Sequence, residues 1–425
     1  MTTPLRRHVE RRLAEVLEHR LDDEPVIALQ GPRSVGKSTL LAEFATTHGV
    51  DVIDLDDPEV QDALQSNPTT YLATQPPVCI DEYQKVPLVL DAIKARLNRS
   101  TQPGAFVITG STRYDALPLA AQSLTGRLHV LTILPLSQGE LAGHHETFLE
   151  GLLTEADAAV DTAATAPRSQ TTRQDYIKRV HAGGLPLALS RSSDAARNRW
   201  FDDYLRLVLD RDVIELSRVR QREQLPRLLT RLAGQTAQVL NIARAAESIG
   251  MEPTTAENYT NLLEAVFLVA RLPAWGTTLR ARATSKPKIH VVDSGIAARL
   301  LRLTPDRLAT LDPSALSEFG HLLETFVVSE LLKQASWLDS VAGHGHWRTH
   351  DGDEVDLVFE RDDGGIVAFE VKAGSRVPGE AFRPLRKLRE ATGTRFLAGI
   401  ALCTGMRTYT FDDRLHVMPI DRLWS

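Results

Sequence analysis

The stretch 25–42 constrains the fold of this chain more than any other part of its sequence. It opens with an apolar run that predicts a buried strand and closes with residues that predict a helix. Gly31 and Gly36 bound the loop between them, and Lys37 and Ser38 follow directly. The spacing G-x-x-x-x-G-K-S is typical of a loop that cradles phosphates. A chance glycine turn is the alternative, and the strand before the loop and the helix after it argue against it.

Each fixed position of this loop has a physical role. Glycine at 31 and 36 lets the backbone approach a phosphate where a Cβ would collide. The N–H groups of the loop and the helix N-terminus then point at the anion. Lys37 would carry positive charge toward the β- and γ-phosphates, and Ser38 would offer a hydroxyl to Mg²⁺. The residues that we assign to phosphate binding in this loop are Gly31, Ser34, Gly36, Lys37, Ser38 and Thr39.

Four further strand patterns follow, at 50–55, 77–82, 105–113 and 127–136. Helical stretches separate them, which predicts an α/β domain whose parallel sheet is covered by helices on both faces. In such sheets chemistry collects at the carboxyl ends of the strands, and the phosphate loop lies at one of these ends.

Two carboxylates, Asp81 and Glu82, end the second of these patterns. Asp81 would hold the Mg²⁺ shell, as P-loop enzymes require. Glu82 would orient and deprotonate the attacking water. Two surface acids in a turn are the alternative.

Three other polar residues leave two interpretations open. Ser111 and Thr112 lie in the polar end of the strand pattern at 105–113, where they would hydrogen-bond the γ-phosphate or only cap a helix. Arg127 would serve the γ-phosphate of a neighbouring subunit as an arginine finger, or form a plain surface salt bridge. A homo-oligomer is therefore a hypothesis of the sequence as well.

Several short motifs carry a resemblance, namely Gln30–Ser38, Ile80–Gln84, Ile108–Ser111, Leu124–Leu128 and Pro135–Ser137. They resemble one bacterial and archaeal family of AAA-type ATP-binding proteins whose C-terminal half is a domain of unknown function. The resemblance runs through nearly the whole chain and implies ATP as the nucleotide. It also implies nucleotide and hydrolysis roles for Lys37, Ser38, Asp81 and Glu82.

The middle of the chain combines a polar insertion with helices. Segment 154–173 is rich in Ala, Thr, Ser and Asp, which predicts a loop or a partly disordered insertion. An amphipathic helix pattern follows at 198–220. For its Arg211 and Asp212 we expect a place on the solvated side of that helix.

Stretch 224–292 has a winged helix-turn-helix outline, with three helix patterns followed by two strand patterns. Such a module can place its third helix in a major groove and its basic wing on phosphates. The third helix here has no arginine to read bases, so we favour a packing or assembly role over specific DNA reading. The basic residues of the link between the strands are Arg280, Arg282, Lys286 and Lys288.

The last third of the chain has the predicted order helix, three strands, helix, strand. With Asp356 and Glu370-x-Lys372 on successive strands, it resembles the core of the PD-(D/E)xK nucleases, the restriction-endonuclease-like fold. The resemblance implies that Glu324, Asp356 and Glu370 hold Mg²⁺ or Mn²⁺, and that Lys372 helps activate water or steady the phosphate. The leading Pro-Asp is absent, and Glu354 opens the motif instead.

Two alternatives remain for these residues: a salt-bridged pair of strands, and a nuclease fold that binds without cutting. The helix that follows carries Arg383, Arg386, Lys387 and Arg389, which would track a phosphate backbone or form a solvated face.

The totals limit what the chain can be. A length of 425 residues predicts two to four domains. The net charge of −6 excludes a polycation that coats nucleic acid. Two distant cysteines fit a reducing cytoplasm, and neither a signal peptide nor a membrane-spanning apolar run is apparent. We divide the chain into a P-loop ATPase domain (1–145), a helical region (146–222), a winged-helix-like domain (223–312) and a nuclease-like α/β domain (313–425).

Two hypotheses of function follow. In the first, ATP hydrolysis drives an enzyme that acts on DNA or RNA through the nuclease-like domain. In the second, the chain is an ATP-dependent switch or scaffold whose nuclease-like domain binds a partner or nucleic acid and never cleaves.

Overall fold

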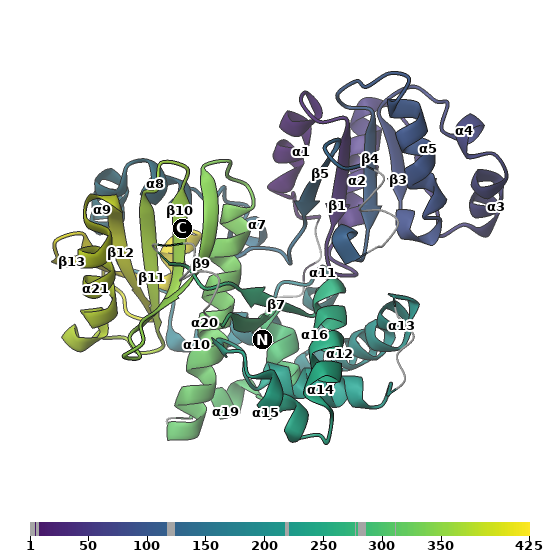
Figure 1. Cartoon of the computed structure of the whole chain (residues 1–425). Coiled ribbons are helices and arrows are strands. Elements are labelled where there is room, and N and C mark those ends of the chain that lie inside the picture. Colours follow the sequence, from purple (N-terminus) through teal and green to yellow (C-terminus); the bar gives the residue numbers. More distant parts are fainter. Residues whose placement is uncertain are drawn as a thin grey trace.

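The computed structural model describes residues 5, 8–116, 124–216, 221–276, 278, 286–310 and 312–425. Figure 1 shows three units: an N-terminal one in purple and blue, a helical one in teal, and a C-terminal one in green and yellow. The long helix α20 (Pro313–Ala335) lies between the helical unit and the C-terminal sheet (Figure 1).

The N-terminal unit is built on a parallel five-stranded sheet, which confirms the predicted α/β class for this part. The strand order is β2-β3-β4-β1-β5, so β1 lies between β4 and β5. The register aligns Gln30 with Gly110 and Thr132, which places the ends of these three strands at one edge. The strands are β1 (Val26–Gln30), β2 (Val52–Asp54), β3 (Val78–Asp81), β4 (Phe106–Gly110) and β5 (Leu128–Thr132).

Both faces of this sheet are buried, as the apolar run of β1 predicts. Val26 and Ala28 pack in the core with helix α5, whereas Ile27 and Leu29 pack in the core with α2. The helices and turns of the unit are α1 (Leu13–Leu21), α2 (Lys37–His48), α3 (Pro58–Ser66), α4 (Pro68–Tyr71), η1 (Tyr83–Lys85), α5 (Leu88–Leu97), η2 (Tyr114–Ala116) and α7 (Gln138–Ala142).

The helical unit contains a small antiparallel sheet of order β6-β8-β7. Three helices alternate with its first strand before the β7–β8 hairpin, in the order that the sequence predicts. Arg280 and Arg282 of the predicted basic link lie outside the described residues. The elements are α10 (Arg173–Ala182), α11 (Pro186–Leu189), α12 (Asp194–Leu207), a π-helical turn η3 (Val208–Asp212), α13 (Val213–Leu216), α14 (Gln224–Ala233), β6 (Gln238–Val239), α15 (Ile242–Glu247), α16 (Pro253–Ala265), β7 (Val269–Leu272), β8 (Lys288–Val291), α18 (Ser294–Leu300) and α19 (Pro305–Ala309).

The C-terminal unit is a mixed six-stranded sheet of order β13-β14-β12-β11-β10-β9. Strands β9, β10 and β11 are antiparallel neighbours, and β12 continues the sheet parallel to β11. Phe359 and Phe369 belong to the core with α20, and Val358 and Ala368 to the core with α21. The elements are β9 (Val341–Arg348), β10 (Glu354–Arg361), β11 (Ile366–Lys372), η4 (Gly379–Phe382), α21 (Arg383–Thr392), η5 (Gly393–Arg395), β12 (Phe396–Cys403), β13 (Tyr409–Asp412), β14 (Leu415–Pro419) and η6 (Ile420–Leu423).

The prediction of a loop or disordered insertion at 154–173 is wrong for its first half. Residues Ala156–Thr165 form helix α9, which follows α8 (Phe148–Thr154). Alanine favours a helix strongly, and burial of Val160 anchors α9 to its surroundings. Both helices lie beside the C-terminal sheet (Figure 1), and the Phe148 ring is 6.3 Å from that of Phe369. These helices therefore pack with the C-terminal unit, although they follow the N-terminal unit in sequence.

Candidate active site

The loop between β1 and α2 has the backbone that its glycines predict. Gly31 has φ +155°, and a Cβ there would lie 2.2 Å from the carbonyl oxygen of Ile133. Gly36 has φ +104°, in the left-handed region that favours glycine, and α2 begins at the next residue. Ser34 also has a positive φ, of +60°. The side chains of Ser38 and Thr39 are exposed in the first turn of α2.

Lys37 lies inside this loop. Its side chain is buried, and Nζ donates hydrogen bonds to the carbonyl oxygens of Gly31 and Pro32, both at 2.9 Å. Burial lowers the pKa of Lys37 to about 8; Arg33 acts in the same direction, and the carboxylate of Glu82 partly opposes it. The lysine is thus held at the centre of the loop with its ammonium close to the acidic end of β3.

The acidic pair stands where β3 ends. The Thr109 hydroxyl of β4 donates to Asp81 Oδ1, and the N–H of Glu82 donates to the same oxygen at 3.1 Å. Glu82 has φ +56° and ψ +45°, a left-handed conformation that is uncommon for a residue with a Cβ. Such strain persists only where the surroundings enforce it, and it gathers at functional sites.

Ser111 and Gln84 hold the carboxylate of Glu82. The Gln84 amide donates to Glu82 Oε2 and, at 3.0 Å, to Ser111 Oγ. Ser111 Oγ also lies 3.4 Å from Glu82 Oε2. The structure therefore places Ser111 beside Glu82, with Thr112 buried next to it. Thr109 and Gln84 were not among the predicted site residues. Gln84 could have been found, because it lies two residues after Glu82 in a motif that carries the resemblance.

Asp212 is a further residue that our sequence analysis assigned wrongly. Instead of facing solvent, its carboxylate is buried and accepts a 2.5 Å hydrogen bond from Arg33 Nε of the phosphate loop. Asp212 ends the π-helical turn η3, and π-helical turns recur at functional sites. An anion from the helical unit thus lies against the phosphate loop, and it also acts on Lys37.

Arg127 lies at the amino ends of the strands, opposite to the phosphate loop. It precedes β5, whose first residue pairs with Val26 at the amino end of β1, whereas the phosphate loop follows the carboxyl end of β1. Arg127 Nη1 donates to Asn98 Oδ1 at 2.6 Å. The structure therefore does not bring Arg127 to the phosphate loop of its own chain.

The residues to which the sequence analysis gave a nuclease-like role meet in the C-terminal unit, but a lysine lies at their centre. Lys288 Nζ lies 2.7 Å from Glu324 Oε1, 2.5 Å from Glu354 Oε1 and 2.9 Å from Asp356 Oδ1. The side chain of Lys288 is 1% exposed, so this lysine of the basic link is packed inside the protein and is not available to a phosphate. The carboxylates come from α20 and from β10, whose pairing with β9 shifts register around Asp356.

The remaining pair of this cluster lies on β11. Lys372 Nζ is 2.5 Å from Glu370 Oε1, and the N–H of Val371 donates to Asp356 Oδ2 at 2.9 Å. Burial raises the pKa of Glu370, and the negative charge of Asp356 raises it further, against the effect of Lys372. Within the described part of the chain, no group of three or more His, Cys, Asp or Glu side chains is arranged to hold a metal ion. The arrangement therefore does not fit the predicted cation at Glu324, Asp356 and Glu370.

The basic helix α21 is neutralised by neighbouring acids. Arg383 and Lys387 both pair with Asp353, and Arg386 lies 3.2 Å from Asp412 Oδ2. Arg389 is 3.6 Å from the same carboxylate. These ion pairs weaken the interpretation of α21 as a phosphate-tracking face.

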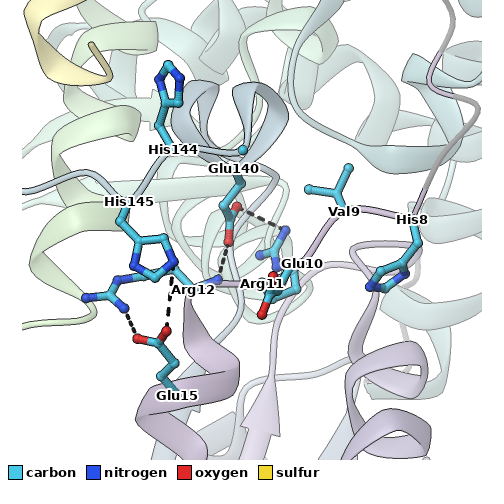
Figure 2. Close-up of a pocket in the computed structure, with 10 residues that line it drawn as sticks. His8, Val9, Glu10, Arg11, Arg12, Glu15, Glu140, His144 and His145 are labelled. Carbon is cyan, nitrogen blue, oxygen red and sulfur yellow. Dashed lines mark hydrogen bonds and ion pairs between the residues drawn. The ribbon is translucent and has the colours of Figure 1, made fainter.

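Figure 2 shows a pocket of 220 Å³ between α1 and the end of α7. Glu140 lies at its centre, where it accepts a 2.9 Å hydrogen bond from the N–H of Arg12 and pairs with Arg11 at 3.4 Å. His145 is 3.8 Å from Glu15 across the same pocket. The residues that line it include none of those assigned to nucleotide or metal.

Comparison with sequence families matches three parts of the chain. Residues 23–142 match an AAA domain, residues 173–307 a domain of unknown function (DUF8612), and residues 319–423 another domain of unknown function (DUF4143). With the geometry of the loop and sheet, the first match establishes a P-loop ATPase-like domain. The match at 319–423 does not identify a nuclease.

The relatives that match nearly the whole chain, and the solved structures, have sequence identities of 28% or less. Uncharacterized proteins of Mycobacterium tuberculosis and Mycobacterium bovis are each 28% identical over 98% of this chain and 85% of their own length. A Walker-type ATPase of Pyrococcus abyssi matches at 14% identity over 71% of this chain and 99% of its own, with a TM-score of 0.42. The RuvB Holliday junction branch migration motor of Thermotoga maritima matches at 17% identity over 62% and 90%, with a TM-score of 0.29. Across the described residues, no helix is both long and apolar enough to cross a membrane.

Proposed function

We propose that this chain binds ATP with Mg²⁺ in the loop between β1 and α2 and hydrolyses it. The observation that carries the proposal is the burial of Lys37 inside the phosphate loop, with the acidic end of β3 next to it. Gly31, Ser34, Gly36 and Thr39 would supply the cradle. The oxygens of Ser38 and Asp81 suit Mg²⁺, which would bridge the phosphates and neutralise their charge.

Glu82 is the residue that we assign to water activation. Its carboxylate stands one residue beyond Asp81, and Gln84 and Ser111 fix its direction. A general base must be aimed before it can act, and an amide and a hydroxyl on one carboxylate achieve this. Ser111 would thereby position the base as well as meet the γ-phosphate.

Two substitutions test this function. Lys37→Ala should weaken binding of a fluorescent ATP analogue at least tenfold, because the charge that meets the phosphates is lost. Glu82→Gln should keep the affinity and lower the rate of phosphate release about a hundredfold or more. The matched controls, Lys94→Ala on α5 and Glu59→Gln on α3, change exposed residues of the same unit and should leave both quantities unaltered. Hydrolysis by Glu82→Gln at the wild-type rate would disprove the assignment of the base.

A second candidate function concerns the other two units. We propose that the helical unit contains a winged-helix-like module, in which α14, α15 and α16 are followed by the β7–β8 hairpin. We propose further that the C-terminal unit is a nuclease-like module that binds DNA, RNA or a partner without cutting. The lysine within the carboxylate cluster favours this switch or scaffold over the ATP-driven nuclease. Action in the cytoplasm, and a homo-oligomer in which Arg127 reaches a neighbouring γ-phosphate, are parts of the same proposal.

A cleavage assay separates the two hypotheses. Single- and double-stranded DNA and RNA are incubated with Mg²⁺ or Mn²⁺ while ATP turns over. We expect that the wild type shows no cleavage that depends on Lys372, so that the wild type and Lys372→Ala give the same result. Cleavage that is lost in Lys372→Ala would restore the nuclease hypothesis.

A further inference from the structure

The seat of Lys288 is unusual because its partners come from another unit of the chain. Lys288 opens β8 of the helical unit, whereas Glu324 lies on α20 and Glu354 and Asp356 lie on β10 of the C-terminal unit. Three carboxylates converge on one ammonium within 2.9 Å. The side chain of Lys288 is almost fully enclosed, at 1% exposure.

The charges explain why the lysine stays there. Burial alone would lower the pKa of Lys288, but Asp356, Glu324 and Glu354 together raise it well above its usual value. Burial likewise raises the pKa of Glu324, with Asp356 adding to the effect. Burial would also raise the pKa of Asp356, but the ammonium and the N–H of Val371 hold it below its usual range. The positive charge of Lys288 therefore offsets the repulsion among these three carboxylates.

An observation on β11 indicates that the cluster can accept more positive charge. Glu370 is buried, with only 6% of its surface exposed. Its Oε2 has no hydrogen-bond partner among the described residues, although Oε1 pairs with Lys372. A cation that replaced Lys288 would find this oxygen available. Hard divalent cations take about six oxygen ligands, which acidic clusters of this kind can supply only when no ammonium stands among them.

Backbone contacts near Lys288 hold it in place. The N–H of Trp275 donates to His346 O at 2.7 Å, and the N–H of His346 donates to Pro273 O at 2.9 Å. These bonds join the segment after β7 to β9. His346 Nε2 also lies 3.0 Å from Lys286 O, two residues before Lys288. The segment after β7 and the residue two positions before Lys288 are therefore both bonded to β9 of the C-terminal sheet.

We propose that Lys288 occupies the cation position of this carboxylate cluster in place of a divalent metal, and so locks β8 to the C-terminal sheet. The inference deepens the second candidate function, because the nuclease-like module would lack its metal as long as the lock is closed. It does not depend on ATP hydrolysis, since neither unit of the lock contains the phosphate loop.

Manganese binding tests the lock. Nucleotide-free protein is titrated with Mn²⁺ and free Mn²⁺ is followed by electron paramagnetic resonance, alongside thermal unfolding with and without Mn²⁺. The wild type and Lys288→Arg should bind no Mn²⁺ at the cluster. Lys288→Met, which keeps much of the apolar stem but removes the charge, should unfold at a lower temperature and bind one Mn²⁺, at least tenfold more tightly than the weak, non-saturating binding elsewhere on the wild type. Mn²⁺ should then raise its unfolding temperature.

The double variant Lys288→Met/Asp356→Asn should lose both the Mn²⁺ binding and the thermal rescue. If Lys288→Met binds no Mn²⁺ and gains no stability from it, the cluster is not a cation position and the proposal fails. Mn²⁺ binding by the wild type that Asp356→Asn abolishes would overturn it too. If Lys288→Met does not fold, this last comparison decides alone: equal, non-saturating Mn²⁺ binding by the wild type and Asp356→Asn supports the lock. Because ATP is absent, a failure here leaves the ATPase proposal standing.

Discussion

Asp212 brings a buried negative charge to the edge of the loop that we assign to phosphates. Its carboxylate is held by Arg33, whose guanidinium is only partly exposed. A negative charge here opposes the arrival of an anionic nucleotide, and it also occupies an arginine of the loop. Across a few ångströms near a protein surface, one such charge is worth on the order of 1–4 kcal/mol before screening by salt.

We therefore expect Asp212→Asn to tighten binding of ATP about three- to tenfold at low salt, with a smaller gain at high salt. The shape of the side chain is kept, whereas the repulsion is removed and Arg33 is released. Titration with a fluorescent ATP analogue at two ionic strengths measures the effect. Asp210→Asn, an exposed aspartate of the same helical turn, is the matched control. Unchanged or weaker affinity in Asp212→Asn would show that the pair serves to order the loop instead.

At the residue scale, the sequence predicts what lies within one short motif. Lys37, Asp81 and Glu82 are identified because their neighbours in sequence are also their neighbours in space. Asp212 and Lys288 could not be identified in this way. Arg33 is 179 residues from Asp212, and Lys288 is 68 residues from Asp356. A charged residue on a helix or hairpin is predicted to be exposed to solvent unless its distant partner is known.

At the scale of elements, the β-strands followed from their patterns better than the connections between them. Strand β1 is an unbroken apolar run, because both of its faces are covered. Segment 154–173 misleads by its polar composition, since α9 needs only Val160 to anchor it. The placement of α8 and α9 against the C-terminal sheet depends on tertiary contacts such as that of Phe148 with Phe369, for which no local pattern gives a signal.

Helix α7 and the loop after it contain a carboxyl group that links packing to pH. Glu146 packs against Gly139, where a Cβ would lie 2.0 Å from its carboxyl carbon. The N–H of Gly139 donates to Oε1 at 2.9 Å, and within the described residues Oε2 has no partner. Burial raises the pKa of Glu146 to about 7, and the nearby acids Glu330 and Glu140 add to the effect.

A carboxyl whose pKa is raised by folding binds its proton more tightly in the folded state. Its contribution to stability is therefore largest below its unfolded pKa of about 4.5 and is lost as the pH rises to about 7. Glu146→Gln mimics the protonated form. We expect its unfolding temperature to equal that of the wild type near pH 5 and to exceed it at pH 8. Thermal unfolding across this range gives the difference. Glu150→Gln on exposed α8 surface should show none, and a constant difference for Glu146→Gln would contradict the shift.

At the scale of the whole molecule, α20 joins the three units. At its middle Glu324 pairs with Lys288 of the helical unit, and near its end Gln334 donates to Leu423 O of the C-terminal unit at 2.7 Å. Between them, Glu330 Oε2 accepts a 2.8 Å hydrogen bond from the N–H of Gln138 at the start of α7. The connection between the P-loop ATPase-like domain and the rest of the chain thus includes one buried carboxylate.

We expect Glu330→Ala to weaken this junction severely. Glu330 is 2% exposed and also lies 2.5 Å from Lys333 Nζ, so its loss would leave the buried ammonium without its ion-pair partner, hydrogen-bonded to the carbonyl of Leu136. Removing one partner of a buried ion pair costs about 3–5 kcal/mol. Glu318→Ala removes a half-buried partner of the more exposed Arg307 from the same helix and should cost about 1 kcal/mol or less.

Calorimetry distinguishes a weakened junction from a general loss of stability. Because α20 contacts every unit, the wild type should unfold in overlapping thermal transitions. In Glu330→Ala, the transition that involves α7 and α20 should move to a lower temperature and separate from the others. The separation has a physical reason: on its α5 face the N-terminal sheet keeps a core of its own, in which Val26 and Ala28 pack with α5 and no residue of α20 takes part. A profile for Glu330→Ala that matches that of Glu318→Ala would mean that Lys333 finds another partner, and that Glu330 does not hold the units together.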